Sequence, residues 1–476
     1  MSERFYVEGG KRLQGEIEVS GAKNAALKFV AAALLAPGKT ILHHVPRIKD
    51  MHTMLTLLDK LGVGTRFSGS TLEIDASTVD SYTAPYELVR QMRASLVVLG
   101  PLVARFGEAE VSAPGGCNLG LRKFNFHVDG LRALGANVEL DHGFIKASAP
   151  GGLRAAEVNF EYPSVGATEN VMMAAVLADG VTIIENAARE PEISALAGFL
   201  NSMGARVMGA GTGRIVTEGV DELDPTEWTV MPDRIEAGTF LMATAATGGD
   251  VTVTNALPEH LKMELEKLRE MGVKVSTTQG SPGIRVRVDD PASLSGVDVA
   301  TLPFPGFATD LQAQMMVLLT QASGAGIITE NVYENRLQVA EELNRLDAGI
   351  DLFGGHRALV RGPRDSNAIQ APSGDQAAAD SDDRMKAPRE RGGSLELRRA
   401  FRQANLTVHL FGSPSETLDV LDRCAPRHDR GELDPRGTDL RVGPDRCAGQ
   451  RDDRPDVRAA HRRPARAAGA LLVPLR

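Results

Sequence analysis

Residues 164–184, SVGATENVMMAAVLADGVTII, contain the pattern on which the fold prediction depends. Ser164 and Gly166 open an apolar run that is long enough for a helix, and Gly180 ends it. The β-branched segment 181–184 then has the composition of a strand. Because the run is apolar on nearly every side, we expect its helix to be buried. The stretch therefore predicts a buried helix, a glycine turn and a strand.

The same order recurs along the chain. Comparable blocks open at Ser20, Met92, Ser164, Asp233 and Thr309. Between them lie four segments with the periodicity of amphipathic helices, each followed by a glycine and a short strand: Thr53–Leu61, Val128–Leu134, Leu196–Met203 and Leu261–Met271. Glycine is suited to the left-handed residue that follows a helix. Each unit is therefore βαβαβ-like, with helices inside and sheets outside, and the copies must pack on one another to bury their cores.

The series stops after five blocks. A sixth is due near residue 380, but no apolar helix follows there. The composition also changes: 11 Lys and 22 Arg occur up to residue 364, against 1 Lys and 19 Arg after it. An arginine-rich tail can be an interaction arm. The interspersed aspartates favour a different hypothesis, in which residues 363–476 are a disordered or out-of-frame replacement for the sixth unit.

The overall composition excludes several classes of protein. The 476 residues are 42% hydrophobic and carry a net charge of −9, so no global attraction to nucleic acid is expected. Three cysteines form neither a disulfide framework nor a CxxC pair. No apolar run approaches the roughly 18 residues of a membrane span. We therefore expect a cytoplasmic protein with no nucleic-acid or membrane partner.

Cys117 lies in a glycine-rich loop at residues 113–122, five positions before Arg122. A thiol works as an acid or a nucleophile when its surroundings tune its pKa, and a nearby cation does so. The alternative is an inert buried cysteine, which is common. The loop alone favours that alternative.

Polar residues gather at the predicted helix N-termini, where free N–H groups and the helix dipole attract anions. They are Lys23 and Asn24, Arg93, Ser164 with Gly166, and Asp310. Each by itself has an ordinary explanation as a solvated or capping residue, and for Lys23 and Arg93 alone that explanation is favoured. Their recurrence predicts a cationic, amide-rich pocket for a polyanionic substrate, provided that the termini face one cleft.

With these motifs in view, residues 1 to about 362 resemble the UDP-N-acetylglucosamine 1-carboxyvinyltransferases, a family of enolpyruvyl transferases. The matching motifs are Ser20-Gly21-Ala22-Lys23-Asn24-Ala25-Ala26, Met92-Arg93-Ala94-Ser95, Pro114-Gly115-Gly116-Cys117, Ser164-Val165-Gly166-Ala167-Thr168, Glu185-Asn186-Ala187-Ala188-Arg189-Glu190-Pro191-Glu192, Pro232-Asp233-Arg234-Ile235-Glu236, Thr309-Asp310-Leu311-Gln312-Ala313-Gln314 and Glu334-Asn335-Arg336. The cysteine in the Pro-Gly-Gly loop distinguishes this family from the related 5-enolpyruvylshikimate-3-phosphate synthases.

The resemblance implies an α/β fold, a two-domain inside-out barrel of repeated βαβαββ units around buried helices. Residues 1–22 with 232–362 would form the first domain, which lacks its sixth unit, and residues 23–231 the second. The implied reaction moves enolpyruvyl from phosphoenolpyruvate to the 3-hydroxyl of UDP-N-acetylglucosamine and releases phosphate, the first committed step of peptidoglycan synthesis. It implies no cofactor and no metal, and we expect a monomer.

The resemblance also assigns roles to residues. Cys117 would deliver a proton to the enol methylene, Asp310 would be the base for the attacking hydroxyl, and Lys23 would be the third catalytic residue. Lys23 and Arg122 would hold phosphoenolpyruvate beside Asn24. The remaining implied substrate-binding residues are Arg93, Lys123, Phe124, Asn125, Phe126, Ser164, Val165, Gly166 and Val332.

Two departures from the family pattern matter. The family usually reads Arg-Pro-x-Asp-x-His after the loop, whereas residues 122–127 read Arg-Lys-Phe-Asn-Phe-His. The family's Asp-Leu-Arg-Ala and Asp-Arg-Gly-Tyr-Glu motifs do not occur after residue 362, apart from a partial match at Asp439-Leu440-Arg441. Three interpretations remain: an active transferase, an inactive truncated remnant and, disfavoured by the cysteine loop, a shikimate-type transferase.

Overall fold

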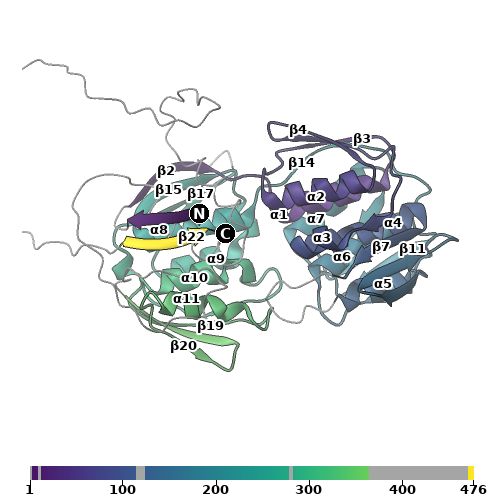
Figure 1. Ribbon diagram of the computed structural model, residues 1–476. Helices are drawn as coiled ribbons and strands as arrows, with labels where there is room; N and C mark the ends of the chain where they lie inside the picture. Colours follow the sequence, from purple (N-terminus) through teal and green to yellow (C-terminus); the bar gives the residue numbers. More distant parts are fainter. Residues whose placement is uncertain (1–2, 9–11, 114–123, 278–281, 364–469, 476) are drawn as a thin grey trace, which may run out of the picture.

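The structure is a computed structural model, and it describes residues 3–8, 12–113, 124–277, 282–363 and 470–475. Figure 1 shows two globular parts joined by a narrow connection. The buried hydrophobic residues form two separate clusters that follow the same division. One contains residues from Ala22 to Val230, and the other contains Leu13, Val19 and residues from Ala237 to Val360. The domain limits stay a prediction, but two cores are present.

The second domain contains three repeated units. Unit one has α1 (Lys23–Ala32), β3 (Lys39–His43), α2 (Lys49–Lys60), β4 (Gly64–Ser68) and β5 (Thr71–Asp75). Unit two has β6 (Thr83–Ala84), α3 (Tyr86–Gln91), the 3₁₀ helix η2 (Arg93–Val98), α4 (Leu99–Phe106), β7 (Glu108–Ser112), α5 (Asn125–Ala133), β8 (Asn137–Asp141) and β9 (Phe144–Ser148). Unit three has β10 (Glu157–Asn159), α6 (Val165–Ala175), β11 (Val181–Glu185), α7 (Pro191–Ser202), β12 (Arg206–Met208) and β13 (Arg214–Glu218).

The first domain repeats the plan twice within the described residues. Unit four has β2 (Leu13–Glu18), α8 (Arg234–Thr247), β15 (Gly249–Thr254), α9 (Lys262–Glu270), β16 (Lys274–Thr277) and β17 (Gly283–Val288). Unit five has β18 (Val299–Ala300), α10 (Gln312–Leu319), β19 (Gly324–Thr329), α11 (Val339–Asn344), β20 (Ile350–Phe353) and β21 (Arg357–Gly362). Short 3₁₀ helices η1 (Ala33–Leu35), η3 (Pro258–His260), η4 (Pro291–Ser293), η5 (Thr309–Leu311) and η6 (Arg336–Gln338) extend or connect these elements.

Every unit builds the same four-stranded sheet. A first strand pairs in parallel with a second, and the second pairs antiparallel with the end of a hairpin, as in the order β10-β11-β13-β12. In unit one the parallel partner of β3 is β14 (Glu227–Thr229), which the chain supplies only after unit three. The second domain is thereby closed by its own last strand.

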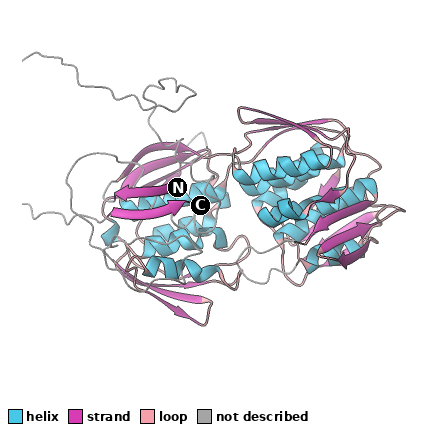
Figure 2. Cartoon of the chain, viewed as in Figure 1, coloured by secondary structure: helices cyan, strands magenta, loops and turns pink. Residues whose placement is uncertain are grey.

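The prediction of helices inside and sheets outside is confirmed. Figure 2 shows helices enclosed by strands in each domain. Residues 25–32 of α1 and all eight residues of α10 are buried. The strands alternate instead, with one side buried and the other toward solvent, as in Val181–Glu185. This alternation is expected of sheets that cover a core on one face only.

The four amphipathic helices are also present, and three of them, α2, α5 and α7, begin earlier than their periodicity predicted, whereas α9 begins one residue later. For example, the helix expected at Leu196–Met203 starts at Pro191. The glycines predicted to follow these helices, Gly62, Gly135, Gly204 and Gly272, all have positive φ. Two of the buried helices open with a 3₁₀ turn, at Arg93 and at Thr309, rather than with a regular α-helical turn.

The two ends of the chain form a further, two-stranded sheet. β1 (Glu3–Glu8) pairs antiparallel with β22 (Ala470–Leu475). No strand was predicted in the tail, although the apolar run at residues 471–473 is a local signal for one. The predicted disorder and the out-of-frame hypothesis concern residues 364–469, which lie outside the described residues.

Candidate active site between the domains

Two chain segments cross between the domains, and they are paired with each other. Gly21 and Pro232 form an isolated antiparallel bridge. The Ala22 N–H donates to the Met231 carbonyl at 2.7 Å, and the Asp233 N–H donates to the Ser20 carbonyl at 2.9 Å. A Cβ on Gly21 would lie 1.8 Å from the His44 carbonyl oxygen, so the close approach requires glycine. The crossings bring the starts of α1 and α8 together.

Asp233 joins those two helix starts. One carboxylate oxygen caps α8 by accepting from the N–H groups of Ile235 and Glu236, at 2.8 and 3.0 Å. The other accepts from the Lys23 N–H at 3.0 Å. Burial raises the pKa of Asp233, and the hydrogen bonds from Glu236 and Lys23 oppose that rise. The carboxylate therefore fixes the first turn of α1 relative to the other domain.

Lys23 lies at this junction with its side chain about one-third exposed. Its Nζ is 2.8 Å from Asp50 Oδ2 at the start of α2. Asn24 follows in the same helical turn and is half-buried. The predicted phosphoenolpyruvate residues of this helix thus lie at the domain crossing, beside a carboxylate.

A second group of predicted residues surrounds the start of α6. The Ser164 hydroxyl caps the helix by accepting from the Ala167 N–H at 3.4 Å. Gly166 lies against the ring of His127, which a Cβ would approach to 3.3 Å. Phe126 packs edge-on against Phe160, with ring centres 6.0 Å apart. The starts of α5 and α6 are therefore adjacent, and Ser164 and Gly166 lie beside the segment that follows the cysteine loop.

The first domain contributes a network around Asp310. Arg336 Nη2 donates to Asp310 Oδ1 at 2.6 Å, and its Nη1 donates to the Thr309 hydroxyl at 3.0 Å. The Thr309 hydroxyl in turn donates to Glu330 at 2.9 Å. The other Glu330 oxygen accepts from the Val332 N–H at 2.8 Å. The two predicted residues of this domain, Asp310 and Val332, are thus held by one continuous network.

The electrostatics of this network favour a charged arginine. Burial opposes the charge of Arg336, but the adjacent Asp310 carboxylate outweighs it and holds the arginine pKa above its ordinary value. The Arg336 side chain is 10% exposed and that of Asp310 is 38% exposed. A buried cation thus orients a carboxylate that remains open to solvent, which suits a group that must reach a substrate.

An ion pair connects the two domains directly. Arg234, at the start of α8, donates from Nε to Glu192 Oε1 at 2.9 Å, and both side chains are almost fully buried. Nearby, the Phe304 N–H donates to Glu190 at 3.4 Å. Burial raises the pKa of Glu190, and the hydrogen bond from Phe304 opposes this. The start of α7 in one domain therefore faces the start of α8 in the other.

Tyr162 shares its electrostatic surroundings with charged residues of the other domain. Burial raises its pKa to about 12, and the charges of Tyr333, Glu190 and Glu330 contribute. Tyr162 precedes Ser164 by two residues in the second domain, whereas Glu330 and Tyr333 flank Val332 in the first. Residues near both helix starts thus influence one another across the interface.

The structure places Lys23 and Asn24 at the domain crossing, but it does not leave the described site residues as a purely cationic pocket. Lys23, Arg234 and Arg336 each pair with a carboxylate. Cys117, Arg122 and Lys123 lie outside the described residues, and Arg93 is described only by its backbone in η2. Among the described residues, Asn125 Oδ1 and Glu192 Oε2 are buried without a hydrogen-bond partner and could accept from a ligand.

Sequence reasoning missed the residues that hold the site together. Arg336, Glu330 and Glu192 were given no role, although Arg336 and Glu192 fall within quoted motifs. The motifs marked their positions, but their partners are far away in the sequence, as with Arg234 and Glu192. Only the folded chain reveals those pairs.

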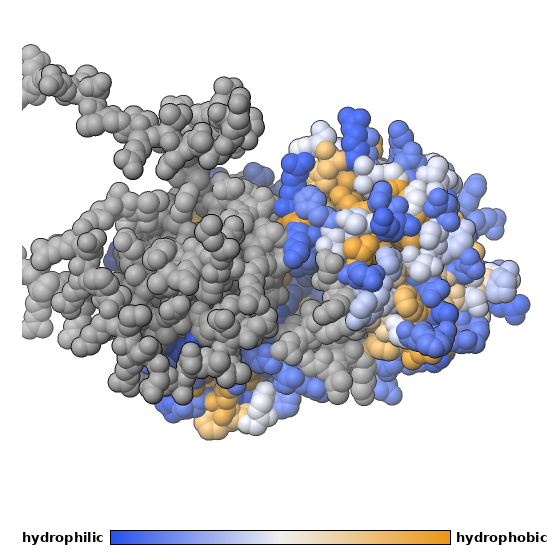
Figure 3. All heavy atoms as spheres, viewed as in Figure 1, coloured by the Kyte–Doolittle hydropathy of each residue, from blue (hydrophilic) through white to orange (hydrophobic). Residues whose placement is uncertain are grey.

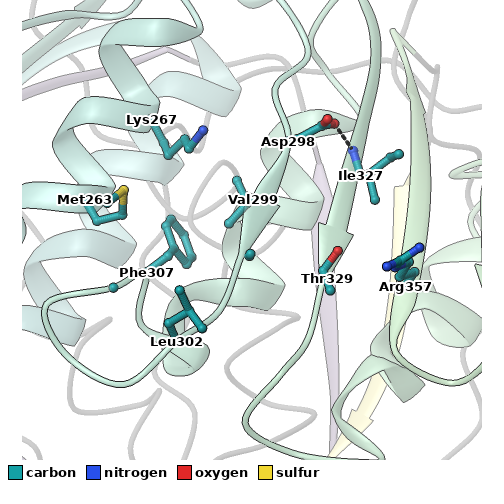
Figure 4. A pocket seen from close by; sticks show the side chains of 11 residues that line it. Met263, Lys267, Asp298, Val299, Leu302, Phe307, Ile327, Thr329 and Arg357 are labelled. Carbon is teal, nitrogen blue, oxygen red and sulfur yellow. Dashed lines mark hydrogen bonds between the residues drawn. The ribbon is translucent and has the colours of Figure 1, made fainter.

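A cavity of about 460 Å³ lies elsewhere, on the first domain between α9 and the sheet of unit five (Figure 4). It is lined by Met263, Lys267, Asp298, Val299, Ala300, Leu302, Gly306, Phe307, Ile327, Thr329 and Arg357. Asp298 Oδ1 accepts from the Ile327 N–H at 2.8 Å within it. None of its lining residues is a predicted site residue, so the cavity contributes nothing to the assignment of the interdomain site.

The surface and helices add little that is distinctive. Figure 3 shows hydrophilic and hydrophobic side chains interspersed over the visible face of the second domain. No helix within the described ranges is both long and apolar enough to cross a membrane.

Comparison with known proteins gives a consistent result. The sequence matches the family described as EPSP synthase (3-phosphoshikimate 1-carboxyvinyltransferase) over residues 7–368. A UDP-N-acetylglucosamine 1-carboxyvinyltransferase of Desulfosudis oleivorans is 48% identical over 377 residues, 79% of this chain and 89% of that protein. A UDP-N-acetylglucosamine 1-carboxyvinyltransferase 1 of Symbiobacterium thermophilum is 51% identical over 366 residues, 76% of this chain and 82% of that protein.

Solved structures show the same fold at lower sequence identity. The enolpyruvyl transferase NikO from Streptomyces tendae superimposes with a TM-score of 0.67 at 24% identity, covering 77% of this chain and 86% of that one. EPSP synthase from Acinetobacter baumannii superimposes with a TM-score of 0.58 at 17% identity, covering 78% and 88%. With the fold, the family match and the relatives in agreement, the chain belongs to the enolpyruvyl transferase family and, within it, to the UDP-N-acetylglucosamine 1-carboxyvinyltransferases.

Proposed function

We propose that this protein transfers the enolpyruvyl group of phosphoenolpyruvate to the 3-hydroxyl of UDP-N-acetylglucosamine, with release of phosphate and without a cofactor. The proposal is supported by the names of relatives that are about half identical in sequence. The structural observation that carries it is the Asp310–Arg336 pair, which holds a partly exposed carboxylate at the domain interface. A general base must be held in place near the proton that it removes, and the ion pair with Arg336, which orients the Asp310 carboxylate, supports this role.

The proposed reaction is an addition followed by an elimination. Asp310 takes the proton of the sugar 3-hydroxyl as its oxygen attacks the central carbon of phosphoenolpyruvate, while Cys117 gives its proton to the enol methylene. Elimination then returns a proton from the new methyl group to the Cys117 thiolate, and phosphate leaves with the proton held by Asp310, which restores the double bond. Each bond formed is matched by one broken, so no oxidant or reductant is required.

The other proposed roles follow from charge and position. Lys23 and Arg122 hold the phosphoenolpyruvate anion, with Asn24 beside them. Arg93, Ser164, Val165, Gly166 and Val332 line the nucleotide-sugar side, together with residues 123–126. Two anionic substrates need cations and dipoles that are fixed before charge develops. The hydrogen bond from the Lys23 N–H to Asp233 and the Ser164 cap support such fixing.

We further propose a cytoplasmic monomer in which residues 1–22 with 232–362 form one domain and residues 23–231 the other. The two buried clusters support the domain limits. Small charged metabolites as substrates, rather than lipids or polymers, support the location.

A second candidate is an inactive remnant of the same enzyme. The family match ends at residue 368, close to the change in composition, and the family's two later motifs are missing. Arginines that those motifs contribute to the anion site would then be lost. This candidate predicts a folded chain without turnover.

One assay separates the candidates. The chain is supplied with phosphoenolpyruvate and either UDP-N-acetylglucosamine or shikimate 3-phosphate, and phosphate release is measured. We expect release only with the nucleotide sugar, and a Cys117→Ala variant should lose at least about a hundredfold in rate, as is typical for a lost proton donor. Cys424→Ala, in the tail, is the matched control. A folded chain that releases no phosphate with either acceptor would establish the remnant instead.

A further inference from the structure

A buried ion pair lies directly beneath the two substrate-binding helix starts of the second domain. Lys28 is one helical turn after Asn24 on α1, and Glu169 is one turn after Val165 on α6. Residues four apart lie on the same face of a helix. The pair therefore lies below the proposed phosphoenolpyruvate side and the proposed nucleotide-sugar side at once.

The contacts of Lys28 connect both helices. Its Nζ donates to the Asn24 carbonyl at 2.9 Å and lies 3.1 Å from Glu169 Oε2. The Lys28 side chain is 10% exposed and that of Glu169 is fully buried. Charged side chains are almost never buried this deeply unless they are paired. One lysine thus binds the first turn of its own helix and the facing helix.

The next residue of α6 extends this junction to unit two. Asn170 Oδ1 accepts from the Gly100 N–H at 2.6 Å, and its Nδ2 donates to the Leu96 carbonyl at 3.3 Å. Its Nδ2 also lies 3.0 Å from His127 Nδ1 at the start of α5. η2, which carries Arg93, packs against both α1 and α6. The polar junction therefore fixes the helix starts of all three units.

We propose that the Lys28–Glu169 ion pair is a positioning device that sets the spacing between the start of α1 and the start of α6, and so aligns the two substrates. The assignment of substrates to the two helices rests on the proposed function. The spacing itself rests on the contacts. Neither residue touches the reacting atoms, so both act through the helices that they join.

The pair is finely balanced because Glu169 is surrounded by competing influences. Burial raises its pKa to about 7, Lys28 opposes that rise, and the carboxylates of Glu192 and Glu190 add to it. Lys28 is the cation that faces it from α1, and the two glutamates face it from the segment that begins α7. Without Lys28, Glu169 would be neutral at ordinary pH and the connection between the helices would lose its attraction.

The first test measures amide exchange in the first turns of α1 and α6 in the absence of substrate. Hydrogen–deuterium exchange is compared for the full chain and for Lys28→Met, Lys28→Arg and the double variant Lys28→Met/Glu169→Gln. The double variant leaves no orphaned buried charge, so it should fold even if Lys28→Met does not. We expect the first turns of α1 and α6 to exchange about tenfold faster in the double variant, since local opening there becomes easier. Exchange equal to that of the parent would overturn the proposal.

The second test measures alignment. None of the residues proposed to line the UDP-N-acetylglucosamine side lies on α1, so the Kd of this substrate and its binding stoichiometry should change little in the double variant. The kcat should fall by about a hundredfold, as expected for a small misplacement of reacting groups. Lys28→Arg keeps the charge and should recover most of the kcat. A merely structural defect would reduce binding stoichiometry and kcat together.

A control variant tests whether loss of any ion pair gives the same result, and the outcomes distinguish a failure of the positioning role from a failure of the proposed function. Arg285→Met/Asp250→Asn removes an exposed ion pair of the first domain and should change neither readout. If the parent chain releases no phosphate, the proposed function fails while the exchange experiment still decides the spacing. If the parent turns over and the double variant matches its kcat, the positioning role is wrong.

Discussion

The two domains repeat one architecture but close it differently. The second domain has three four-stranded sheets, and β14 returns from the end of its third unit to pair with β3 of its first. The described part of the first domain has two such sheets, and a two-stranded sheet of β1 and β22 in addition. Closure in the second domain therefore uses a strand next to its own units, whereas unit four of the first domain takes its parallel strand, β2, from near the start of the chain.

The buried helices of the two domains are also joined by different chemistry. In the second domain α1 and α6 meet through the charged pair Lys28–Glu169. In the first domain α8 and α10 meet through a neutral bond, from Gln314 Nε2 to the Thr239 hydroxyl at 3.0 Å. A repeated backbone thus does not require a repeated core: among the described residues, a charged pair joins α1 to α6 and a neutral hydrogen bond joins α8 to α10.

The largest expected effect tests whether the domains unfold separately. Gly130 and Gly238 each allow a close helix contact, since a Cβ would lie 2.3 Å from Val171 Cγ2 and 2.4 Å from Leu311 Cδ1. We expect Gly130→Leu to destabilise the second domain, and Gly238→Leu the first, by about 3 kcal/mol each, because overpacking a tight core forces backbone shifts.

The single tryptophan makes the measurement specific to one domain. Trp228 packs edge-on against Phe29 and Phe199 in the second domain. The urea midpoint of the tryptophan fluorescence transition should therefore fall in Gly130→Leu and stay unchanged in Gly238→Leu. Far-ultraviolet circular dichroism, which reports on both domains, should show the destabilisation in both variants. Gly135→Ala is the control for substitution of a glycine without overpacking. A Cβ there meets no neighbouring atom, so any effect comes from the positive φ of 88° alone. If the urea midpoint of the tryptophan transition falls in both leucine variants, the two domains unfold as one unit.

Most of the local structure in both domains could be predicted from the sequence. The apolar runs predicted the buried helices, and Gly62, Gly135, Gly204 and Gly272 predicted where the amphipathic helices end. The pairing of β14 with β3 and of β1 with β22 could not be predicted. Strands so far apart in sequence leave no local periodicity that identifies their partner. The difference in closure between the domains was therefore invisible at that level.

The candidate site shows the same limit. Helix N-termini rich in polar residues identified the positions of Lys23, Ser164 and Asp310 from sequence. The partners that orient them, such as Asp50 for Lys23 and Arg336 for Asp310, depend on how helices from different units meet. Lys28 and Glu169 illustrate the difficulty, since a lysine and a glutamate within apolar helices carry no local signal that they pair.

A smaller effect sharpens the contrast between charged and neutral junctions. The pKa of Glu169 is raised from 4.5 to about 7 by burial, so the folded state binds a proton more tightly than the unfolded state does between these values. Stability from this group is complete at low pH and is lost as the pH rises toward 7. We expect the second domain to lose about 2 kcal/mol of stability through Glu169 between pH 5 and pH 7.

Glu169→Gln should remove that loss, and urea unfolding followed by Trp228 fluorescence at the two pH values measures it. Glu264→Gln is the matched control in the first domain, where burial also raises the carboxyl pKa and the Ala308 N–H opposes it by donating at 2.8 Å. The glutamine can still accept that hydrogen bond, and the tryptophan signal should be unaffected. A pH dependence that survives Glu169→Gln unchanged would place its origin in another group, with buried Asp233 the next to test.

The smallest expected effect tests whether an exposed ion pair stabilises its domain as the buried Lys28–Glu169 pair does. Arg285 and Asp250 form a two-pronged pair on β17 and β15, with nitrogen–oxygen distances of 2.7 and 2.6 Å, but the arginine side chain is half exposed. Water screens such a pair and competes for both groups. Arg285→Met should therefore leave the urea midpoint of the first domain unchanged within error, at both low and high salt. A clear shift there would mean that geometry matters more than burial, and the contrast with Lys28–Glu169 would then rest on position in the fold rather than on exclusion from water.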